Sequence, residues 1–414
     1  MKKLQRKRGE AIKQTVVPPA SKSYLQRALL AAALCETPVA ILGRNDCDDV
    51  LACVDLLGLF GKKCVPTQNG YLVTDGPAKE RGNCAESATA LRLCLPAACA
   101  LGKKAEFCGQ GRLMRRPHAP LLNVLSRNGI DVTATAESVY VRGSLQAGRY
   151  EIAGDVSSQF VSGLLFALPL LNAPNTLVLT TPLQSQGYVA MTLETLRAFG
   201  IVLRQTENGF DVPAPQKYFA ETFRCEEDAS SAAVWLAYGA LANGATVRLP
   251  RNTLQPDAAI VSFLGRAGVD VRRTGEDCTV LAASPHGFCA DVSQCPDLAP
   301  TLAAFCACAE GQSVLTGLQR LKYKESDRLC GICEMLRACK VPFECKEDRL
   351  FVKGGKVFPA AVDVKGDHRF VAMAAILSAR TEITLQEANV VSKSDPYFWQ
   401  TFRMLGGEDV DLGK

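Results

Sequence analysis

One unit of apolar and polar positions repeats along the whole chain. Each copy starts with polar residues, continues into a stretch rich in Ala and Leu, and passes through Gly or Asn into a short alternating segment. Apolar residues at helical spacing predict a helix, and alternation predicts a strand. Six copies can be anchored at Ser21, Ser87, Ser157, Ser230, Asp297 and Asp367, with separations of 66, 70, 73, 67 and 70 residues. A period of about 70 residues indicates six repeats of one supersecondary unit.

Each copy continues with a second helix, which stops at a glycine, and with a hairpin. The turn sequences ENG at 207–209 and GED at 275–277 support the third and fourth hairpins. The sixth copy reaches the C-terminus without a complete hairpin, whereas residues 4–17 form a spare strand-like segment. We therefore expect the N-terminus to complete the sixth unit.

This closure predicts two domains. Three complete copies would form residues 19–226, and the other three would form a second domain from residues 1–18 and 227–414. The anchor helices are apolar on nearly all sides, so we expect them to be buried. If their N-termini point the same way within each domain, the helix dipoles and polar heads of two such faces would make one electropositive cleft between the domains.

The composition agrees with a large globular protein and excludes several classes. The chain of 414 residues is 48% hydrophobic and has a net charge of +5. Its basic residues are spread along the sequence and not clustered as in nucleic-acid-binding proteins, and this modest charge suits a small anionic substrate. The sequence has no run of 18 apolar residues, so it predicts no membrane span. The basic N-terminus lacks the apolar segment of a secretory signal.

The 18 cysteines predict free thiols in a reducing cytoplasm, since most lie within apolar runs. One CxxC pair, Cys330 and Cys333, falls inside a helical pattern without a second pair, so we expect it to have neither a zinc nor a redox role. A catalytic histidine would have to be one of the three in the chain, His118, His286 or His368.

The polar heads of the anchor helices carry more than N-capping requires. A serine at each head is explained by capping alone. The cations at the heads are not, and these are Lys22, Arg27, Arg92 and Arg369. Arginine forks and lysine ammonium groups match the oxygens of phosphate and carboxylate, so this many cations indicate substrates that carry several negative charges.

The densest charged cluster outside the heads is KESDRL. Lys324, Glu325 and Arg328 stand three and four residues apart, so we expect a helix to group them. The alternative interpretation is a solvated helix start with internal ion pairs. Arg116 and Lys393 each precede a further proline-marked segment and add two more candidate cations.

These motifs together resemble the enolpyruvyl transferase family over essentially the whole chain. The resemblance rests on SKSYLQR, ESATALR, RRP, SSQF, SQGYVAMTL, DASSA, CPDLAP, KESDRL, DHR and SKSDP, in the family order. It implies an α/β (α+β) fold, the inside-out barrel of two similar domains with three βαβαββ units each. It also implies transfer of the enolpyruvyl group of phosphoenolpyruvate to the 5-hydroxyl of shikimate 3-phosphate through a tetrahedral intermediate, with no metal or organic cofactor, in a cytoplasmic monomer.

The resemblance assigns a role to some of the motif residues. It implies a catalytic group of Asp297 as base for the hydroxyl, with Glu325, Lys22 and Lys324 for the methylene proton. Shikimate 3-phosphate would contact Lys22, Ser23, Arg27, Ser157, Ser158, Gln159, Ser185, Tyr188, Asp297 and Lys324. Phosphoenolpyruvate would contact Lys22, Ala88, Arg92, Arg116, Gln159, Arg328, His368, Arg369 and Lys393. The first domain would mainly bind shikimate 3-phosphate, and the second would carry the base and part of the phosphoenolpyruvate site.

The second head departs from the family pattern. Ala85 and Ala88 stand where the family usually has glycine. The resemblance implies that in the family the backbone of the glycine at the position of Ala88 lies against phosphoenolpyruvate, and against the longer inhibitor glyphosate. An extra methyl in a packed pocket can cost about 1–3 kcal/mol. We therefore hypothesise that Ala88 makes the enzyme tolerant of glyphosate; the alternative is a neutral packing difference.

Two other functions remain as alternatives. One is the sister reaction, which uses UDP-N-acetylglucosamine as acceptor, but that enzyme is expected to begin with a Lys-Asn pair where this chain has Ser21–Ser23. The other is a non-catalytic anion-binding relative. Retention of Asp297 and Glu325 beside the cations argues against it, because carboxylates in an anion site weaken binding unless the chemistry needs them.

Overall fold

The computed structural model describes residues 1–7 and 14–413. Contacts divide the chain into two units. Ala20–Glu226 is here called the central unit, and Met1–Pro19 together with Glu227–Lys414 is called the split unit. The boundaries expected from the repeat differ from this division only in the placement of Pro19.

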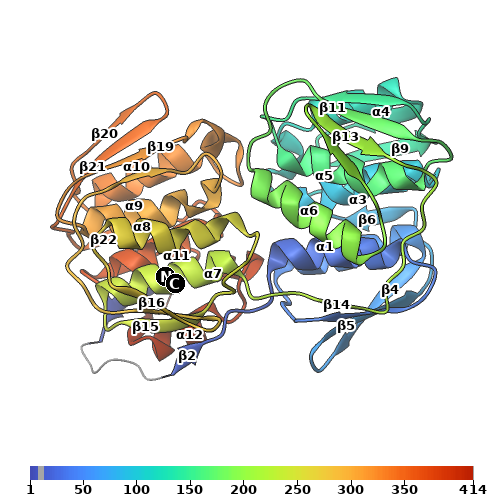
Figure 1. Cartoon of the computed structure of the whole chain (residues 1–414). Coiled ribbons are helices and arrows are strands. Elements are labelled where there is room, and N and C mark those ends of the chain that lie inside the picture. Colours follow the sequence, from blue (N-terminus) through green and yellow to red (C-terminus); the bar gives the residue numbers. More distant parts are fainter. Residues whose placement is uncertain (8–13, 414) are drawn as a thin grey trace. The chain divides into compact units, whose positions relative to one another are not determined.

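Each unit holds three repeats of the same elements: strand, helix, strand, helix and an antiparallel strand pair, here called the hairpin, whose last strand in the sixth repeat is the N-terminal strand. The described residues form six four-stranded sheets. In every sheet the first strand pairs in parallel with the second, and the second pairs antiparallel with the last strand of the hairpin, as β6 (Arg81–Asn83), β7 (Ala105–Cys108) and β9 (Ser138–Gly143) do. A parallel pair requires a crossover, and in the second, third, fifth and sixth repeats the anchor helix supplies it. In the first and fourth repeats the first strand, Thr222–Arg224 or Thr15–Val16, comes from a part of the chain that does not lead directly into the anchor helix. The fold is therefore the α/β repeat architecture that the sequence predicts (Figure 1).

The central unit contains the first three repeats. The first repeat consists of β14 (Thr222–Arg224), α1 (Lys22–Ala33), β3 (Val39–Leu42), α2 (Asp48–Leu56), β4 (Lys62–Thr67) and β5 (Gly70–Asp75). The second consists of β6, α3 (Ala88–Ala100), β7, α4 (Ala119–Arg127), β8 (Ile130–Ala134) and β9. The third consists of β10 (Arg149–Ile152), α5 (Ser158–Ala167), β11 (Asn175–Leu179), α6 (Gln186–Ala198), β12 (Arg204–Thr206) and β13 (Gly209–Val212).

The split unit contains the other three repeats. The fourth repeat consists of β2 (Thr15–Val16), α7 (Ala229–Leu241), β15 (Ala245–Arg248), α8 (Ile260–Arg266), β16 (Val271–Thr274) and β17 (Asp277–Val280). The fifth consists of β18 (Cys289–Asp291), α9 (Ala299–Cys308), β19 (Gly311–Thr316), α10 (Arg328–Ala338), β20 (Phe343–Lys346) and β21 (Arg349–Gly354). The sixth consists of β22 (Ala360–Val362), α11 (His368–Leu377), β23 (Ile383–Leu385), α12 (Phe398–Met404), β24 (Gly407–Asp411) and β1 (Lys2–Arg6).

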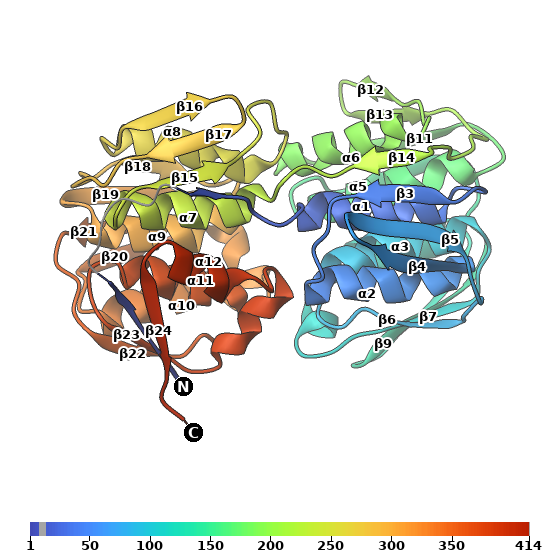
Figure 2. The same cartoon turned by 90° about the horizontal axis from the view of Figure 1, so that it is seen from below.

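The N-terminus completes the sixth repeat, but residues 4–17 do not form a single strand. Strand β1 lies between β23 and β24, with Lys3 opposite Thr384 and Val410 (Figure 2). The separate strand β2 pairs instead with β15 of the fourth repeat. Residues 8–13 of the expected segment lie outside the described residues. The sequence prediction is therefore corrected: the N-terminal segment supplies a strand to each of two repeats.

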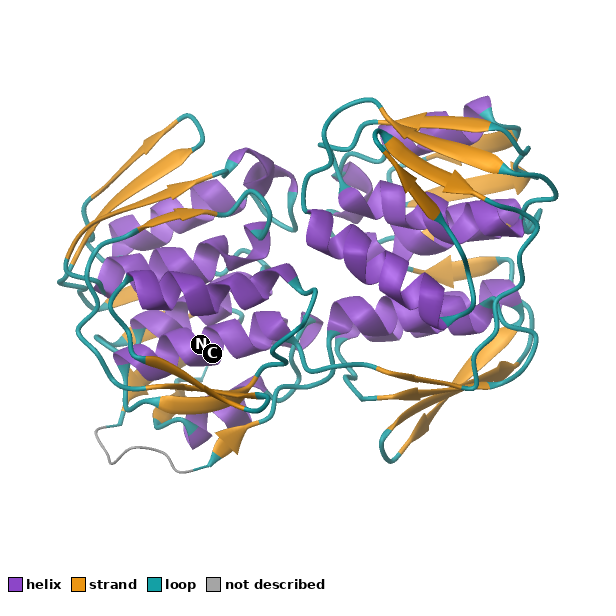
Figure 3. Cartoon of the chain, in the orientation of Figure 1, coloured by secondary structure: helices purple, strands orange, loops and turns teal. Residues whose placement is uncertain are grey.

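The anchor helices form the core of each unit, as their uniform apolarity predicts. Within each unit the helices lie side by side and the sheets cover them (Figure 3). Small residues allow close packing: a Cβ added at Gly163 of α5 would lie 2.1 Å from the carbonyl oxygen of Arg92 on α3. In the described part of the chain, no helix has the length and apolarity of a membrane span.

The helix heads separate into two kinds. Ser21, Ser87, Ser157 and Asp367 are N-caps, each accepting a hydrogen bond from a backbone N–H of the first turn. The other two anchors do not cap. Helix α7 is capped by Asp228, and Asp297 lies in the short 3₁₀ helix η5 (Pro296–Leu298) that precedes α9. The side chains of Ser230 and Asp297 are therefore available for contacts with other side chains.

The loop before α3 holds Ala85, one of the two alanines at positions where glycine is expected, in a conformation that favours glycine. Ala85 has φ +46°, in the left-handed region that side chains disfavour. Ala85→Gly should therefore raise the free energy of unfolding by about 1 kcal/mol, since the strain exceeds the entropy that glycine adds to the unfolded chain. Urea denaturation measures this change. Ala88→Gly, at the first helical residue of α3, should give no such gain; equal effects at both positions would contradict the strain assignment.

Candidate active site

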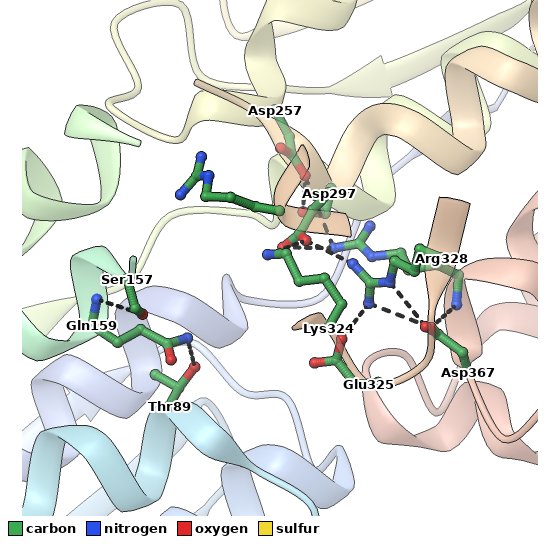
Figure 4. Close-up of polar contacts among 12 residues, drawn as sticks. Thr89, Ser157, Gln159, Asp257, Asp297, Lys324, Glu325, Arg328 and Asp367 are labelled. Carbon is green, nitrogen blue, oxygen red and sulfur yellow. Dashed lines mark hydrogen bonds and ion pairs between the residues drawn. The ribbon is translucent and has the colours of Figure 1, made fainter. Parts of the chain in front are cut away.

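In the central unit, the heads of α1, α3 and α5 are linked by side-chain hydrogen bonds. Gln26 donates to Ser87 Oγ over 2.9 Å, which joins α1 to α3. Gln159 donates to Thr89 Oγ1 over 2.7 Å, which joins α5 to α3 (Figure 4). The N-terminal ends of these helices thus lie together, as the repeat predicts, and their dipoles favour a common anion.

Arg92 is the organising cation of this group. Its Nη1 donates to Gln159 Oε1 over 2.9 Å, and its Nε donates to His118 Nδ1 over 3.3 Å. His118 Nε2 lies 2.8 Å from the carbonyl oxygen of Leu113, so the ring is the neutral tautomer with its proton on Nε2. Burial, with Arg92 and Arg116 nearby, lowers the pKa of His118 to about 4. His118 is therefore a neutral support for Arg92.

A second cluster joins α1 to α6. Arg27 is 1% exposed and donates to Thr192 Oγ1 over 2.9 Å, to Ser23 O over 2.8 Å and to Tyr188 O over 3.0 Å. Burial lowers the pKa of Arg27 to about 10, so it stays a cation at neutral pH. Three residues assigned to shikimate 3-phosphate thus lie together, with Arg27 holding the backbone of the other two.

The remaining predicted residues of the central unit occupy helix ends. Lys22 forms an ion pair of 2.8 Å with Asp49 at the start of α2. Ser185 is the N-cap residue of α6, with φ +54°, and Ser158 is the first residue of α5. Arg116 directly follows the 3₁₀ helix η2 (Leu113–Arg115), and Ala88 is the first residue of α3 with 3% of its surface exposed.

In the split unit, Arg328 is surrounded by three carboxylates. Its Nη1 donates to Asp297 over 2.7 Å, its Nη2 to Glu325 over 2.6 Å and its Nε to Asp367 over 2.8 Å (Figure 4). Burial opposes ionisation of Arg328, but Asp367, Glu325 and Asp297 raise its pKa well above the usual value. The guanidinium is a permanent charge that fixes the relative positions of the three carboxylates.

Asp297 is held as a carboxylate by cations. Lys324 Nζ lies 3.0 Å from Asp297 Oδ1, the oxygen that also accepts from Arg328. Burial favours the neutral acid, yet Lys324, Arg328 and Arg369 together hold the pKa of Asp297 well below its usual range. Burial also lowers the pKa of Lys324, and the neighbouring carboxylates of Asp297 and Glu325 offset only part of that effect. A lysine with a lowered pKa beside a carboxylate is suited to proton transfer.

The grouping of Lys324, Glu325 and Arg328 is observed, but its predicted cause is wrong. No helix contains all three residues: the 3₁₀ helix η6 (Gln319–Tyr323) ends before Lys324, and α10 begins at Arg328 with Asp327 as its N-cap. The side chains meet because Arg328 binds the carboxylates around it, including Glu325 three residues earlier.

The head of α11 and the loop before α12 complete the set. Arg369 Nη2 lies 3.8 Å from Asp297 Oδ2, and the His368 ring lies beside Asp367, with Nδ1 3.7 Å from Oδ1. Lys393, at the end of the 3₁₀ helix η7 (Ala388–Lys393), donates to Gly366 O over 2.8 Å. These contacts bring every predicted site residue of the split unit toward the heads of α9 and α11.

Sequence reasoning missed several partners of these residues. Asp49, Thr192 and Asp257 each contact a predicted site residue from another element. The paired acidic residues Asp48 and Asp49 at a helix start were a signal for the first, because acidic residues favour a helix N-terminus. Thr192 lies within the motif SQGYVAMTL, but the resemblance assigns no role to it, and Asp257 lies in a segment with no motif. Only the tertiary fold brings them to Arg27 and Arg369.

The split-unit cluster can perform acid–base chemistry on an anion. It holds an ionised carboxylate, a lysine with a lowered pKa and two arginines within a few ångströms. Among the described residues, no group of three or more His, Cys, Asp or Glu side chains is arranged to hold a metal ion.

Comparison with solved structures places this architecture in one class. The structure of EPSP synthase from Acinetobacter baumannii superposes with a TM-score of 0.81 over 99% of this chain and 100% of that one, at 22% identity. The enolpyruvyl transferase NikO from Streptomyces tendae gives a TM-score of 0.77 at 18% identity, over 99% and 98% of the two chains. The fold is that of the enolpyruvyl transferases.

Sequence comparison then identifies the family within this class. The model of the EPSP synthase (3-phosphoshikimate 1-carboxyvinyltransferase) family matches residues 7–402, and the chain belongs to this family. The 3-phosphoshikimate 1-carboxyvinyltransferase of Clostridium kluyveri is 35% identical over 407 residues, which cover 95% of each chain. That of Dehalococcoides mccartyi is 33% identical over 404 residues, which cover 95% of this chain and 96% of the relative.

Proposed function

We propose that the protein transfers the enolpyruvyl group of phosphoenolpyruvate to the 5-hydroxyl of shikimate 3-phosphate, giving 5-enolpyruvylshikimate 3-phosphate and phosphate. The observation that carries this proposal is Asp297, an ionised carboxylate held by Lys324 and Arg328 in a chain of the EPSP synthase family. The reaction needs a base beside an anion site, and this cluster provides both.

The chemistry proceeds by addition and elimination. Asp297 accepts the proton of the 5-hydroxyl while the oxygen of that hydroxyl bonds to C2 of phosphoenolpyruvate. The methylene C3 gains a proton and becomes a methyl group. Glu325, with Lys22 and Lys324, handles that proton. The resulting tetrahedral intermediate then loses a proton from the methyl group as the C2–phosphate bond breaks, and inorganic phosphate leaves. Both substrates must be oriented for these steps, which is the work of the anion-binding groups.

The two units divide the binding in this proposal. The central unit holds shikimate 3-phosphate through Ser23, Arg27, Ser157, Ser158, Gln159, Ser185 and Tyr188, with Lys22, Asp297 and Lys324 completing the site. Phosphoenolpyruvate is held by Lys22, Ala88, Arg92, Arg116, Gln159, Arg328, His368, Arg369 and Lys393. The clustering of the α1, α3 and α5 heads in one unit supports the first set, and that of the α9 and α11 heads in the other supports the second.

Phosphate release tests the reaction and separates it from the alternatives. Purified protein would be given phosphoenolpyruvate with shikimate 3-phosphate, with UDP-N-acetylglucosamine or with neither. We expect release with shikimate 3-phosphate only. Release with the nucleotide sugar would assign the sister reaction, and no release with either acceptor would favour a binding protein.

The proposal extends to the state and location of the enzyme, which we take to be a monomer in the cytoplasm. All the cysteines of the chain are free thiols in the structure, which supports a reducing compartment. Sedimentation at working concentration tests the monomer, and a dimer mass would contradict it.

The same proposal gives a prediction for Ala88. The Ala88 methyl lies at the head of α3, beside Thr89, which binds Gln159. Ala88→Gly should lower the glyphosate inhibition constant at least tenfold, about 1.4 kcal/mol, because the methyl no longer opposes the longer inhibitor. The matched control is Ala90→Gly, also buried near the start of the helix, which should leave the constant within about twofold. An unchanged glyphosate inhibition constant in Ala88→Gly would contradict the tolerance hypothesis.

A further inference from the structure

One buried carboxyl group near the split-unit cluster has no role in the proposed mechanism. Asp257 lies in the 3₁₀ helix η4 (Pro256–Ala259), directly before α8, and is 1% exposed. Its Oδ2 accepts a hydrogen bond from the Ser230 hydroxyl, and its Oδ1 is buried with no hydrogen-bond partner among the described residues. Burying a carboxyl group with one oxygen unsatisfied costs free energy, which points to a role for this group.

The geometry connects this carboxyl to Asp297 through one guanidinium. Arg369 Nη2 lies 3.9 Å from Asp257 Oδ2 and 3.8 Å from Asp297 Oδ2. Two carboxylates therefore flank a single nitrogen atom of Arg369. Figure 4 shows Asp257 and Asp297 near each other. Ser230 is one of the two anchor residues that do not cap their helix, and its hydroxyl holds Asp257 in this position by a hydrogen bond.

We propose that Asp257 is a positioning residue of the reaction: by sharing Arg369 with Asp297, its ionised carboxylate keeps Asp297 a competent base. This inference rests on the proposed function. Lys324, Arg328 and Arg369 make Asp297 a weak proton acceptor, and a negative charge on the far side of Arg369 offsets part of that effect. Because electrostatic coupling between two sites is mutual, each of the two carboxylates raises the pKa of the other.

The charges around Asp257 set where it titrates. Burial raises its pKa to about 6; Arg369 opposes that rise, and Asp297 and Asp228 add to it. The Ser230 hydrogen bond favours the ionised form, and a further titratable neighbour is Cys295, whose pKa is raised by burial and by Asp257. Asp257 is thus ionised above about pH 6 and neutral below it, within the range in which an enzyme can be assayed.

Asp257→Asn tests the proposal, because asparagine has the shape of the protonated acid. At pH 8 kcat should fall about tenfold, the effect of roughly one pKa unit at the base, while KM for phosphoenolpyruvate stays within about threefold. At pH 5 wild-type Asp257 is protonated too, so the ratio of the two kcat values should approach one. Titration of the substrate phosphates affects both enzymes alike and cancels in this ratio.

Asp395→Asn is the matched control. Asp395 is also buried, also has a pKa raised to about 6 by burial, and also accepts from a serine of α7, Ser231, over 2.9 Å. Asp395 accepts from the Ser231 hydroxyl and the Tyr397 backbone N–H and contacts neither Arg369 nor Asp297, so its kcat ratio to wild type should not vary with pH. A pH-independent loss in Asp257→Asn, no loss at any pH, or the same pH dependence in both variants would overturn the proposal.

Two further measurements test the proposal even if the asparagine variant folds poorly or the proposed reaction is not the one catalysed. Ser230→Ala removes the hydrogen bond to the ionised carboxylate, so the acid limb of kcat should move to higher pH; an unmoved limb counts against Asp257. Independently of catalysis, carboxyl ¹³C NMR should show Asp257 titrating near pH 6, with a lower midpoint in Asp297→Asn. A midpoint unaffected by Asp297→Asn overturns the coupling even if the protein proves to catalyse another reaction.

Discussion

Asp297→Asn should lower kcat by about a thousandfold, the middle of the range that a general base contributes. Asparagine has the same shape as aspartate and can still accept from Lys324 and Arg328 through its oxygen, but it cannot take the proton of the 5-hydroxyl. KM for phosphoenolpyruvate should not rise, since the cations lose a competing negative charge. The measurement is steady-state phosphate release with both substrates varied.

Asp277→Asn is the control for this substitution. Asp277 also pairs with an arginine, Arg248, over 3.3 Å, but it lies on strand β17 outside the helix heads. Its kcat should equal that of the wild type. If Asp297→Asn kept more than a tenth of wild-type kcat, the base would have to be another group, and Glu325 would be the next to replace.

Arg328→Met should destabilise the split unit by about 3–5 kcal/mol, the cost of leaving a buried charge without its partner. Arg328 is 1% exposed and Asp367 is fully buried, so methionine would leave Asp367 ionised in a dry environment or force it to bind a proton. The free energy of unfolding by urea, monitored through the tryptophans Trp235 and Trp399 of that unit, measures the effect.

Two variants test the assignment of this loss. Arg337→Met, in the same helix α10, removes an arginine that stacks on Phe343 at 5.5 Å, and should cost less than about 1 kcal/mol. Adding Asp367→Asn to Arg328→Met should recover part of the lost stability, because it removes the unpaired charge. A double variant less stable than Arg328→Met would show that the hydrogen bonds of Asp367, and not its charge, determine the loss.

The repeat architecture was accessible from the sequence because its signal is local. Each anchor helix is apolar on all sides and each hairpin alternates, so the periods of the pattern report the elements directly. The heads were accessible for the same reason: four of the six anchors are N-caps, and capping is set by residues within one turn.

The parts that could not be predicted depend on contacts distant in sequence. Strand β2 is two residues long and pairs with β15, a partner that no local pattern specifies. Lys324 and Glu325 have helical spacing but lie outside a helix, because Asp327 caps α10 after them. Asp257 follows a proline in an ordinary-looking turn, and its importance comes from Arg369, which arrives from another repeat. Such residues are found by tertiary geometry alone.

The strands exchanged along the chain also impose an order on folding during synthesis. The central unit has all its strands once β14 (Thr222–Arg224) has left the ribosome, so its three repeats can close early. The split unit cannot: β1 must remain without its partners until β23 and β24 are made, and Leu4 finally pairs with Ile383 and Asp409. Closing so long a loop is slow, and an unpaired strand edge exposed meanwhile invites aggregation. Among the described strands, β1 is therefore the one that waits longest for its partners during synthesis.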